Sequence, residues 1–347
     1  MNKKSLIVLS ILWAICSPDP LLADAIVLKS GKTVEGKIIE KTDGYIKINC
    51  YDVPLTFFLD EIDYIKPDKE FSGNIAQLEQ KSFLWKVTSQ LSTVYLFGSI
   101  HIAKEDMYPL QEEVERAFNV SDVLAVEVDL NNIGHSKRQK IFKETIYPPQ
   151  ETLQQHLSKE TFELLRDKLS NLNINIVNFL NYKPWLLSLQ LTEIALLKLG
   201  YDSNMGLDLY FLRKAEGKKK ISELESFDFQ IDLLSKFTDK EQDLLLYYTI
   251  INLDNIERQM DRLVQAWKWG DVKYMEKILF SAFSQYPEMS FIYERIFVER
   301  NKNMALKIEG FLNMRNTYFV VVGAGHLTGQ DSIIYILQEK GYPVQQL

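Results

Sequence analysis

Two histidines in this chain occupy matching contexts, and they are the residues best suited to chemistry. His101 closes the segment 95–101 (YLFGSIH), and His326 closes the segment 320–326 (VVVGAGH). Each segment is an apolar run that ends in Gly-x-x-His, and the 347 residues contain only 4 histidines. An imidazole can bind a metal or transfer a proton. The repeated context predicts one site built from two similar halves, with both imidazoles converging on a metal or a reacting group.

The elements that must position these histidines are predicted to be parallel strands. Residues 94–97 and 318–322 are apolar, β-rich runs that end just before each Gly-x-x-His. Ligands of a parallel sheet bind at the carboxyl edge of the strands. Gly98 and Gly323 would allow the backbone to turn sharply at that edge, and Gly325 is a further turn residue. We therefore expect the two imidazoles to meet where these strands end.

Glu127 is the third candidate for the site. It lies near the carboxyl end of a second apolar run, 123–128, which follows a helix predicted over 110–118. This strand–helix–strand order predicts a parallel pair with a right-handed crossover. A carboxylate in an apolar strand is costly unless it is paired or bound to a metal. Two imidazoles and a carboxylate suit Zn, Mn, Co or Fe, which could activate a water for hydrolysis. Glu127 could instead reach solvent or pair with an arginine.

Three other carboxylates are weaker candidates. Glu225 follows a strand predicted over 220–224 and could supply another carboxylate at the same edge. Asp208 lies early in a helix predicted over 206–215, where a negative charge also suits the helix dipole. Asp129 is expected at the rim, as a cap or as support for the residues that bind the metal.

Common catalytic signatures are missing from the sequence. It has no P-loop, no G-x-S-x-G elbow, no H-E-x-x-H and no C-x-x-C. The other two histidines, His135 and His156, lie in polar segments and are predicted to be surface residues. If the chain is an enzyme, a water activated by a metal is therefore favoured over a covalent mechanism.

The composition is that of a globular protein. Hydrophobic residues make up 46% and charged residues 25%, and the net charge is −7. An acidic balance argues against nucleic acid as a partner. Beyond the first residues no stretch reaches 18 uninterrupted apolar positions, so we expect no transmembrane segment in the mature chain.

Residues 1–25 are predicted to be an export signal. Two lysines precede the apolar run 6–16, and Ala-Asp-Ala at 23–25 offers a cleavage site. The prediction places the protein in the periplasm or cell envelope. Lipid attachment at Cys16 and an uncleaved anchor remain alternatives.

The fold class predicted for the rest is α/β, preceded by a small all-β barrel. Short strands and turns over 26–67 suggest an SH3-like or Sm-like barrel, followed by a polar linker over 68–74. Residues 75–347 form the main domain. Its mainly parallel sheet is expected to come largely from the two ends of the domain, with a large helical insertion at about 151–310.

The main domain resembles the TraB/GumN family. The matching motifs occur in order at 96–101, 107–110, 117–118, 121–122, 127–129, 183–185, 205–208, 215, 223–225, 230, 299–301, 304, 322–327 and 341–344. The resemblance implies an EreA/ChaN-like α/β fold in which the paired Gly-x-x-His motifs face one site. It does not cover the predicted barrel.

The resemblance also implies an activity. Animal relatives, the TIKI proteins, are divalent-metal-dependent proteases. Carried over, His101, Glu127 and His326 would be the metal-binding or catalytic residues. Arg300 would be a supporting polar group, unless it is a surface arginine, and Asp208 and Glu225 match the family's other polar positions less firmly.

The leading hypothesis is an exported hydrolase that uses Mn, Co or Zn on a peptide or small-molecule substrate. One alternative is an envelope protein that binds a metal or haem without catalysis. Another is an interaction protein that docks an envelope partner through its small barrel.

Overall fold

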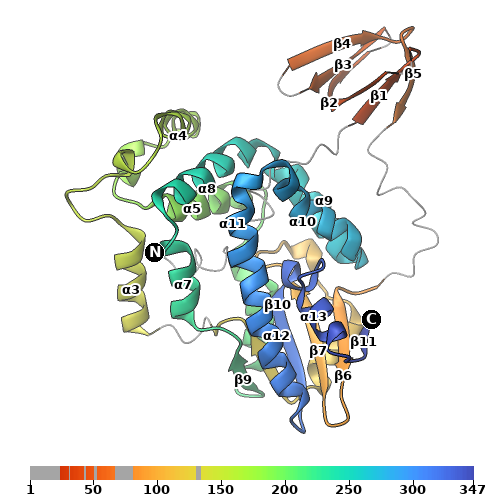
Figure 1. Cartoon of the computed structure of the whole chain (residues 1–347), viewed down its shortest axis with the longest axis vertical. Coiled ribbons are helices and arrows are strands. Elements are labelled where there is room, and N and C mark those ends of the chain that lie inside the picture. Colours follow the sequence, from red (N-terminus) through yellow and green to blue (C-terminus); the bar gives the residue numbers. More distant parts are fainter. Residues whose placement is uncertain (1–23, 31, 43, 51–52, 67–80, 130–133) are drawn as a thin grey trace. The chain divides into compact units, whose positions relative to one another are not determined.

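The computed structural model of this chain describes every residue except 1–23, 31, 43, 51–52, 67–80 and 130–133 (Figure 1). The described residues form two compact units, within 24–66 and from 81 to 347. Cys16, nearly all of the predicted export signal and the predicted linker 68–74 lie outside the described residues.

The N-terminal unit is an open antiparallel sheet. Its strands are β1 (Asp24–Leu28), β2 (Thr33–Lys41), β3 (Tyr45–Cys50), β4 (Val53–Phe58) and β5 (Ile62–Lys66). The order is β4-β3-β2-β1-β5, around a small core of Ile26, Ile46, Ile48 and Ile62. The described residues show no ladder between β4 and β5, so the expected closed barrel is not found.

Strand β1 overlaps the predicted cleavage site. Asp24 pairs with Gly36 of β2, and Ala25 pairs with Glu35 of β2 and with Lys66 of β5. Cleavage after Ala25 would therefore remove the first two residues of the strand.

The main unit is built on a mostly parallel sheet of six strands. They are β6 (Leu84–Thr88), β7 (Thr93–Ser99), β8 (Val123–Val126), β9 (Lys220–Glu223), β10 (Thr317–Gly323) and β11 (Val344–Gln346). The order is β11-β6-β7-β10-β8-β9. Strands β7, β10, β8 and β9 run parallel, whereas β6 is antiparallel to both of its neighbours. Strand β10 is buried along almost its whole length, which explains its continuous apolar run.

Strand β10 lies between β7 and β8, which differs from the predicted pairing. The sequence order suggested that β7 and β8 are neighbours, but β10 pairs with both, with Val322 opposite Gly98 and Val321 opposite Val126. Strands that follow each other along the chain need not pair when a later strand fits between them. The strand that leads to His326 is therefore central, and Glu127 follows its direct neighbour.

Helices flank this sheet and fill most of the middle of the chain. They are α2 (Glu112–Val120), α3 (His135–Thr145), α4 (Lys159–Asn171), α5 (Pro184–Lys198), α6 (Leu207–Ala215), α7 (Phe227–Ser235), α8 (Asp239–Asn252), α9 (Ile256–Trp269), α10 (Val272–Gln285), α11 (Ser290–Ile292), α12 (Glu299–Leu312) and α13 (Ile333–Glu339). Helix α2 packs against β7 and β10, and α6 against β8 and β9. Figure 1 shows α12 in front of the strands. The helical region is not one uninterrupted insertion, because β9 returns to the sheet within it.

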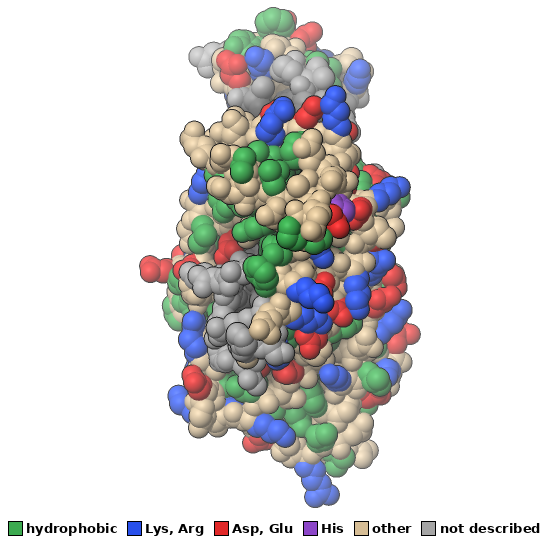
Figure 2. All heavy atoms as spheres, turned by 90° about the vertical axis from the view of Figure 1, so that its left-hand side faces the viewer, with side chains coloured by type: hydrophobic (Ala, Val, Ile, Leu, Met, Phe, Trp, Pro, Cys, Tyr) green, Lys and Arg blue, Asp and Glu red, His purple; other side chains and the backbone are tan. Residues whose placement is uncertain are grey.

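The surface carries mixed charges. On the face in Figure 2, Lys and Arg side chains lie interspersed with Asp and Glu, without a continuous basic field. None of the described helices is long and apolar enough to cross a membrane.

Gly98 is required for close packing rather than for a turn. It lies inside β7, and a Cβ atom there would come within 2.4 Å of Phe83 Cδ1 and 3.1 Å of the Ala324 Cα. Gly325 is similar, because its Cβ would lie 2.7 Å from Phe297 Cε1. Gly323 ends β10 with an ordinary φ of −53°. The glycines of the paired motifs thus let the segments that carry the histidines approach their neighbours.

We expect Gly98→Ala to lower the free energy of unfolding by about 1–3 kcal/mol, because the added methyl overpacks the contact between β7 and Phe83. Gly310→Ala is the matched control, since a Cβ at this helical position meets nothing within 4 Å. It should be neutral or stabilise by up to about 1 kcal/mol. Urea unfolding of both variants measures this, and equal stability of the two would contradict the packing argument.

Candidate functional site

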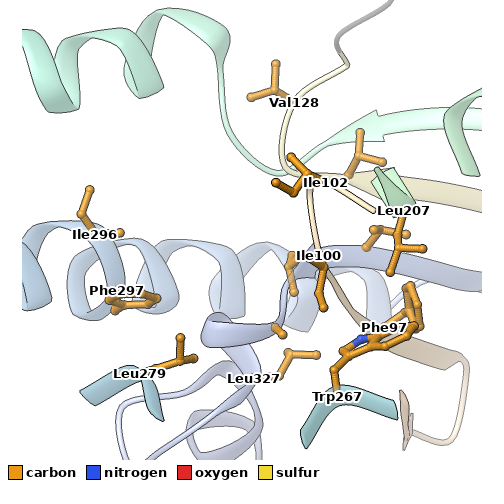
Figure 3. Packing of buried hydrophobic residues seen from close by; sticks show 14 of the residues in the cluster. Phe97, Ile100, Ile102, Val128, Leu207, Trp267, Leu279, Ile296, Phe297 and Leu327 are labelled. Carbon is orange, nitrogen blue, oxygen red and sulfur yellow. The ribbon is translucent and has the colours of Figure 1, made fainter. Parts of the chain in front are cut away.

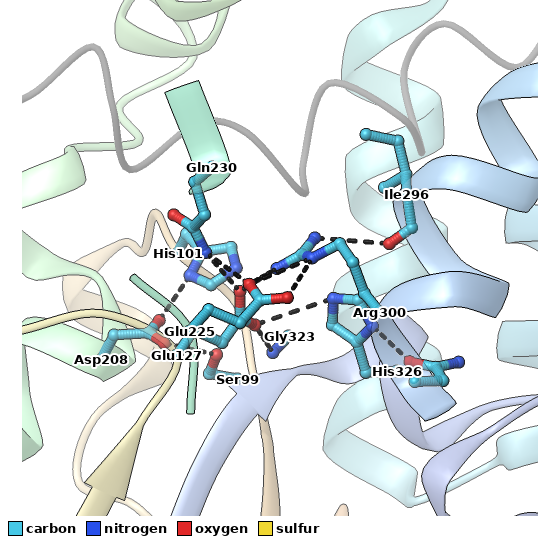
Figure 4. A network of polar contacts seen from close by, with 11 residues as sticks. Ser99, His101, Glu127, Asp208, Glu225, Gln230, Ile296, Arg300, Gly323 and His326 are labelled. Atoms are coloured by element: carbon cyan, nitrogen blue, oxygen red, sulfur yellow. Dashed lines mark hydrogen bonds and ion pairs between the residues drawn. The ribbon is translucent and has the colours of Figure 1, made fainter. Parts of the chain in front are cut away.

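The two histidines of the paired motifs meet at one edge of the sheet. His101 lies two residues after β7, and His326 lies in a short 3-10 helix, Ala324–Leu327, directly after β10. Ser99 pairs with Gly323 across these parallel strands, so both loops leave the sheet at the same level. Both histidines are buried, His101 with 7% and His326 with 0% of its surface exposed. Figure 4 shows their rings on either side of Glu127 and Glu225.

Asp208 holds the ring of His101. The Nδ1 atom of His101 lies 2.7 Å from Asp208 Oδ2, and the Ser99 hydroxyl donates to Asp208 Oδ1 over 3.0 Å. Burial acts to lower the pKa of His101, but the charges of Asp208 and Glu127 and the hydrogen bond to Asp208 act in the opposite direction, and together they raise that pKa. Helix α6 can bring Asp208 this close because it is preceded by Gly206, whose Cβ would lie 2.1 Å from the His101 carbonyl oxygen.

Asn301 holds the ring of His326 and fixes its tautomer. The Asn301 side-chain nitrogen donates to the carbonyl of Asp331 over 2.8 Å, so its oxygen faces His326 Nδ1 at 2.6 Å. Nδ1 must therefore carry the proton, and Nε2 has a lone pair. Burial and the nearby Arg300 lower the pKa of His326 to about 3. The ring is neutral at physiological pH.

Arg300 binds two buried carboxylates at once. Its Nη2 donates to Glu127 Oε2 over 2.6 Å and to Glu225 Oε2 over 2.7 Å, and its Nε donates to Glu225 Oε1 over 2.9 Å. Burial alone would raise the pKa of Glu127, but Arg300 and the two histidines lower it to about 2. Glu225 and Glu127 in turn raise the pKa of Arg300 against the effect of burial. Arg300 is only 1% exposed, so it is not a surface arginine.

The remaining contacts of Glu127 leave one of its oxygens partly free. Oε2 accepts from Arg300 and, over 3.2 Å, from Gln230, which also donates to Glu225 over 3.0 Å. Oε1 accepts from the backbone N–H of Gly323 over 2.7 Å. A carboxylate oxygen can accept two hydrogen bonds. Oε1 therefore retains capacity on the side of His326.

The side chains at this edge of the sheet are of the kinds that bind metal ions. The Nε2 atoms of His101 and His326 are buried and hydrogen-bond to no described group. His326 Nε2 lies 3.8 Å from Glu127 Oε1, so two acceptors face each other beyond hydrogen-bonding distance. Each Nδ1 is held by an oxygen, which is how proteins orient ligating histidines. The described residues hold no group of three His, Cys, Asp or Glu side chains arranged to bind a metal ion, so the two imidazoles and the carboxylate match a metal site in the kind of their atoms and not in their arrangement.

The structure brings most of the predicted residues together. Arg300, Glu127 and Glu225 form one connected polar cluster, with His326 beside Glu127, and the His101–Asp208 pair lies next to this cluster. Asp208, predicted only as a weak candidate, is the direct partner of His101.

Three other residues that the sequence analysis singled out lie in different surroundings. The backbone N–H of Asp129 donates to Glu223, at the end of β9. His156 is not a simple surface residue, because it is partly buried, stacks on Tyr147 and contacts Glu151 and Asp239. His135 begins α3.

Sequence reasoning assigned no role to Ser99, Gln230 or Asn301. A signal for Asn301 and Arg300 exists in the sequence, because both continue the apolar stripe of α12 one turn back from Met304 and Ala305. Polar residues on a buried stripe need partners inside the protein. Gln230 carries no comparable signal.

The fold and the paired histidines define an α/β protein with a buried imidazole–carboxylate site at the sheet edge. The TraB/PrgY/gumN family model matches residues 83–346, and the chain belongs to this family.

The sequences of several curated relatives align with most of this chain. Uncharacterized protein YbaP of Escherichia coli (strain K12) is 26% identical over 70% of this chain and 87% of its own length. A metalloprotease TIKI homolog of Amphimedon queenslandica is 24% identical over 77% of this chain, and metalloprotease TIKI2 of Danio rerio is 22% identical over 78%. The matches cover 62% of each of these two proteins. No solved structure matches the chain.

We expect Arg300→Met to destabilise the main unit by about 3–5 kcal/mol, because two buried carboxylates lose their counter-charge. Arg116→Met is the control, since the ion pair of Arg116 with Glu112 is exposed and such pairs contribute at most about 1 kcal/mol. Adding Glu225→Gln to Arg300→Met should recover part of the loss. Chemical denaturation of the three variants tests this, and a cost as small as that of the control would refute the central role of Arg300.

Proposed function

We propose that this protein is an exported, metal-dependent hydrolase that cuts peptide bonds. The observation that carries the proposal is the pair of buried Nε2 atoms, on His101 and His326, beside the Glu127 carboxylate. The lone pair of His326 Nε2, the Glu127 anion and the Nε2 of a neutral His101 would together attract a cation. The names of the TIKI relatives, which are metalloproteases, support the same chemistry. Export rests on the sequence pattern of residues 1–25.

In this proposal His101 and His326 hold the metal through Nε2, with Glu127 as the nearest carboxylate. A bound Mn, Co or Zn ion would supply Lewis acidity toward the substrate carbonyl and the attacking water. Asp208 and Asn301 keep the two rings oriented from the opposite side, at Nδ1. Each ring thus presents its Nε2 atom on the side away from the oxygen that holds Nδ1.

Glu127 would orient the attacking water. Its pKa of about 2 makes it a permanent anion and a weak base, and its Oε1 retains room for a hydrogen bond from water. In the hydrolysis, the water oxygen bonds to the carbonyl carbon, the C–N bond breaks, and the leaving nitrogen takes a proton. Arg300 has its donors committed to Glu127, Glu225 and the Ile296 carbonyl, so we assign it to positioning rather than to substrate binding.

The rival function is a protein that binds a metal without turnover. A haem is disfavoured, because the cavity beside the two histidines measures only about 30 Å³, far below the roughly 300 Å³ of small-ligand pockets. Stoichiometric metal without catalysis would establish the rival.

We expect His101→Ala and His326→Ala each to reduce peptide hydrolysis at least about 100-fold and to lower the bound metal below one equivalent. His156→Ala is the matched control, because its partners Glu151 and Asp239 lie outside the site. The measurements are mass spectrometry of a peptide library with added Mn²⁺, Co²⁺ or Zn²⁺, and elemental analysis of the purified protein. Full activity of both site variants would exclude the proposal.

We expect Asn301→Ala to weaken metal binding about 10–100-fold, because the His326 ring loses the oxygen that fixes its tautomer. Asn313→Ala is the control, since Asn313 sits at the exposed end of α12 and its side-chain nitrogen donates to the Glu309 carbonyl, away from the histidines. Metal titration followed by calorimetry reads the affinity without any substrate. Equal affinities in the two variants would show that Asn301 does not serve the metal.

A further inference from the structure

A small cavity lies directly beside the two histidines. It measures about 30 Å³, it is half-enclosed, and the rings of His101 and His326 form part of its wall. Ser99 also lines it, and the larger side chains around it are apolar and come from several elements, namely Ile100, Leu263, Met275, Leu279 and Phe297. Figure 3 shows Phe297 and Leu279 together, across from Ile100.

The wall is selective for an apolar group. Leu263, Met275, Leu279 and Phe297 are buried, and no Asp, Glu, Lys or Arg side chain lines the cavity. A charged group placed there would lose its hydration without gaining a partner, which is costly. An apolar group would bury its surface against carbon on most sides.

Two features distinguish this cavity from a packing defect. Two of its polar members, His101 and His326, each carry a buried Nε2 without a described hydrogen-bond partner. One wall also depends on a glycine: a Cβ on Gly325 would lie 2.7 Å from Phe297 Cε1, so this glycine lets the Phe297 ring close over the site. The ring centroids of Phe297 and His326 lie 5.4 Å apart.

We propose that this cavity binds the side chain of the substrate residue next to the bond that is cut, and that it selects small apolar side chains from alanine to valine. The inference rests on the proposed hydrolase function and adds the substrate class. The size follows from the volume, since the cavity exceeds the roughly 10–15 Å³ that one water needs. About 30 Å³, part of which an ion on the two Nε2 atoms would fill, therefore accepts at most two or three carbon atoms, whereas an aromatic ring would require the tightly packed wall to move.

The test uses the full chain and varies both the substrate peptide and a residue of the cavity wall. Peptides that differ at one position, with Ala, Val, Phe or Asp, are offered to the wild type, to Leu279→Ala and to Leu312→Ala. Leu312 is a matched control, because it is buried like Leu279 but lies at the other end of β7. There its carbonyl accepts a hydrogen bond from Ser89, in the turn between β6 and β7. Met275→Ala replaces Leu279→Ala if that variant does not fold.

We expect the wild type to cut the Ala and Val peptides at least about tenfold faster, in kcat/KM, than the Phe and Asp peptides. Leu279→Ala should raise the relative rate for Phe at least about tenfold, and Leu312→Ala should keep the wild-type preference. Hydrolysis without preference, or the same preference in both variants, would overturn the cavity assignment and leave the hydrolase proposal standing.

A binding measurement covers the case in which no peptide is cut. N-acetyl-valinamide should shift the NMR signal of the Met275 methyl group, whereas the amide of N-acetyl-aspartate should not. A selective shift without hydrolysis would support the cavity and refute the hydrolase. No shift and no hydrolysis would overturn both.

Discussion

The ion pairs of Arg300 with Glu127 and Glu225 are the interaction on which the rest of the site depends. Burying three charges is expensive, and only close pairing with complete hydrogen bonding offsets that cost. Here the guanidinium meets both carboxylates within 2.9 Å, and Gln230 links the same two groups. Helix α12 is thereby tied to the ends of β8 and β9, whose residues are far away in the sequence.

Arg300 also influences the charge of two groups beside it, Glu127 and His326. Its positive charge opposes the effect of burial at Glu127 and adds to it at His326, so that both pKa values fall, to about 2 and about 3. Near neutral pH the site therefore presents an anionic carboxylate beside a neutral imidazole. A buried ion pair is weak evidence for stability. Its arrangement here is better explained by the two groups that it holds in place, the lone pair of His326 Nε2 and the anionic Glu127 Oε1, which lie 3.8 Å apart.

The sequence predicted the strand ends better than their order. The runs before His101, Glu127 and His326 are strands because continuous apolar residues suit a sheet that is buried on both faces. The place of β10 between β7 and β8 depends on tertiary packing, to which local periodicity is blind. The open edge of the N-terminal sheet escaped prediction for the same reason, since strand spacing does not determine closure.

The site residues, too, could be predicted only in part from the sequence. Glu127 was found because a carboxylate at an apolar strand end requires a partner, but the sequence left that partner open. Arg300 was identified through a family resemblance, although its place on the buried stripe of α12 is visible in the pattern. Asp208 was harder to assign, because an acid in the first turn of a helix is already explained by the helix dipole. Its pairing with His101 depends on the approach of α6, which Gly206 permits.

One helical segment joins the polar site to the apolar cavity. Phe297 walls the cavity, Arg300 binds the carboxylates and Asn301 holds His326. Residues three and four apart share a helix face, so these side chains point toward the same region. The segment begins with a π-helical turn, Tyr293–Val298, a rare conformation that occurs often at functional sites. Arg300 donates to the Ile296 carbonyl within this turn. A shift of this turn would move the cavity wall at Phe297 together with Arg300 and Asn301. The shape of the cavity and the geometry of the polar site are therefore coupled.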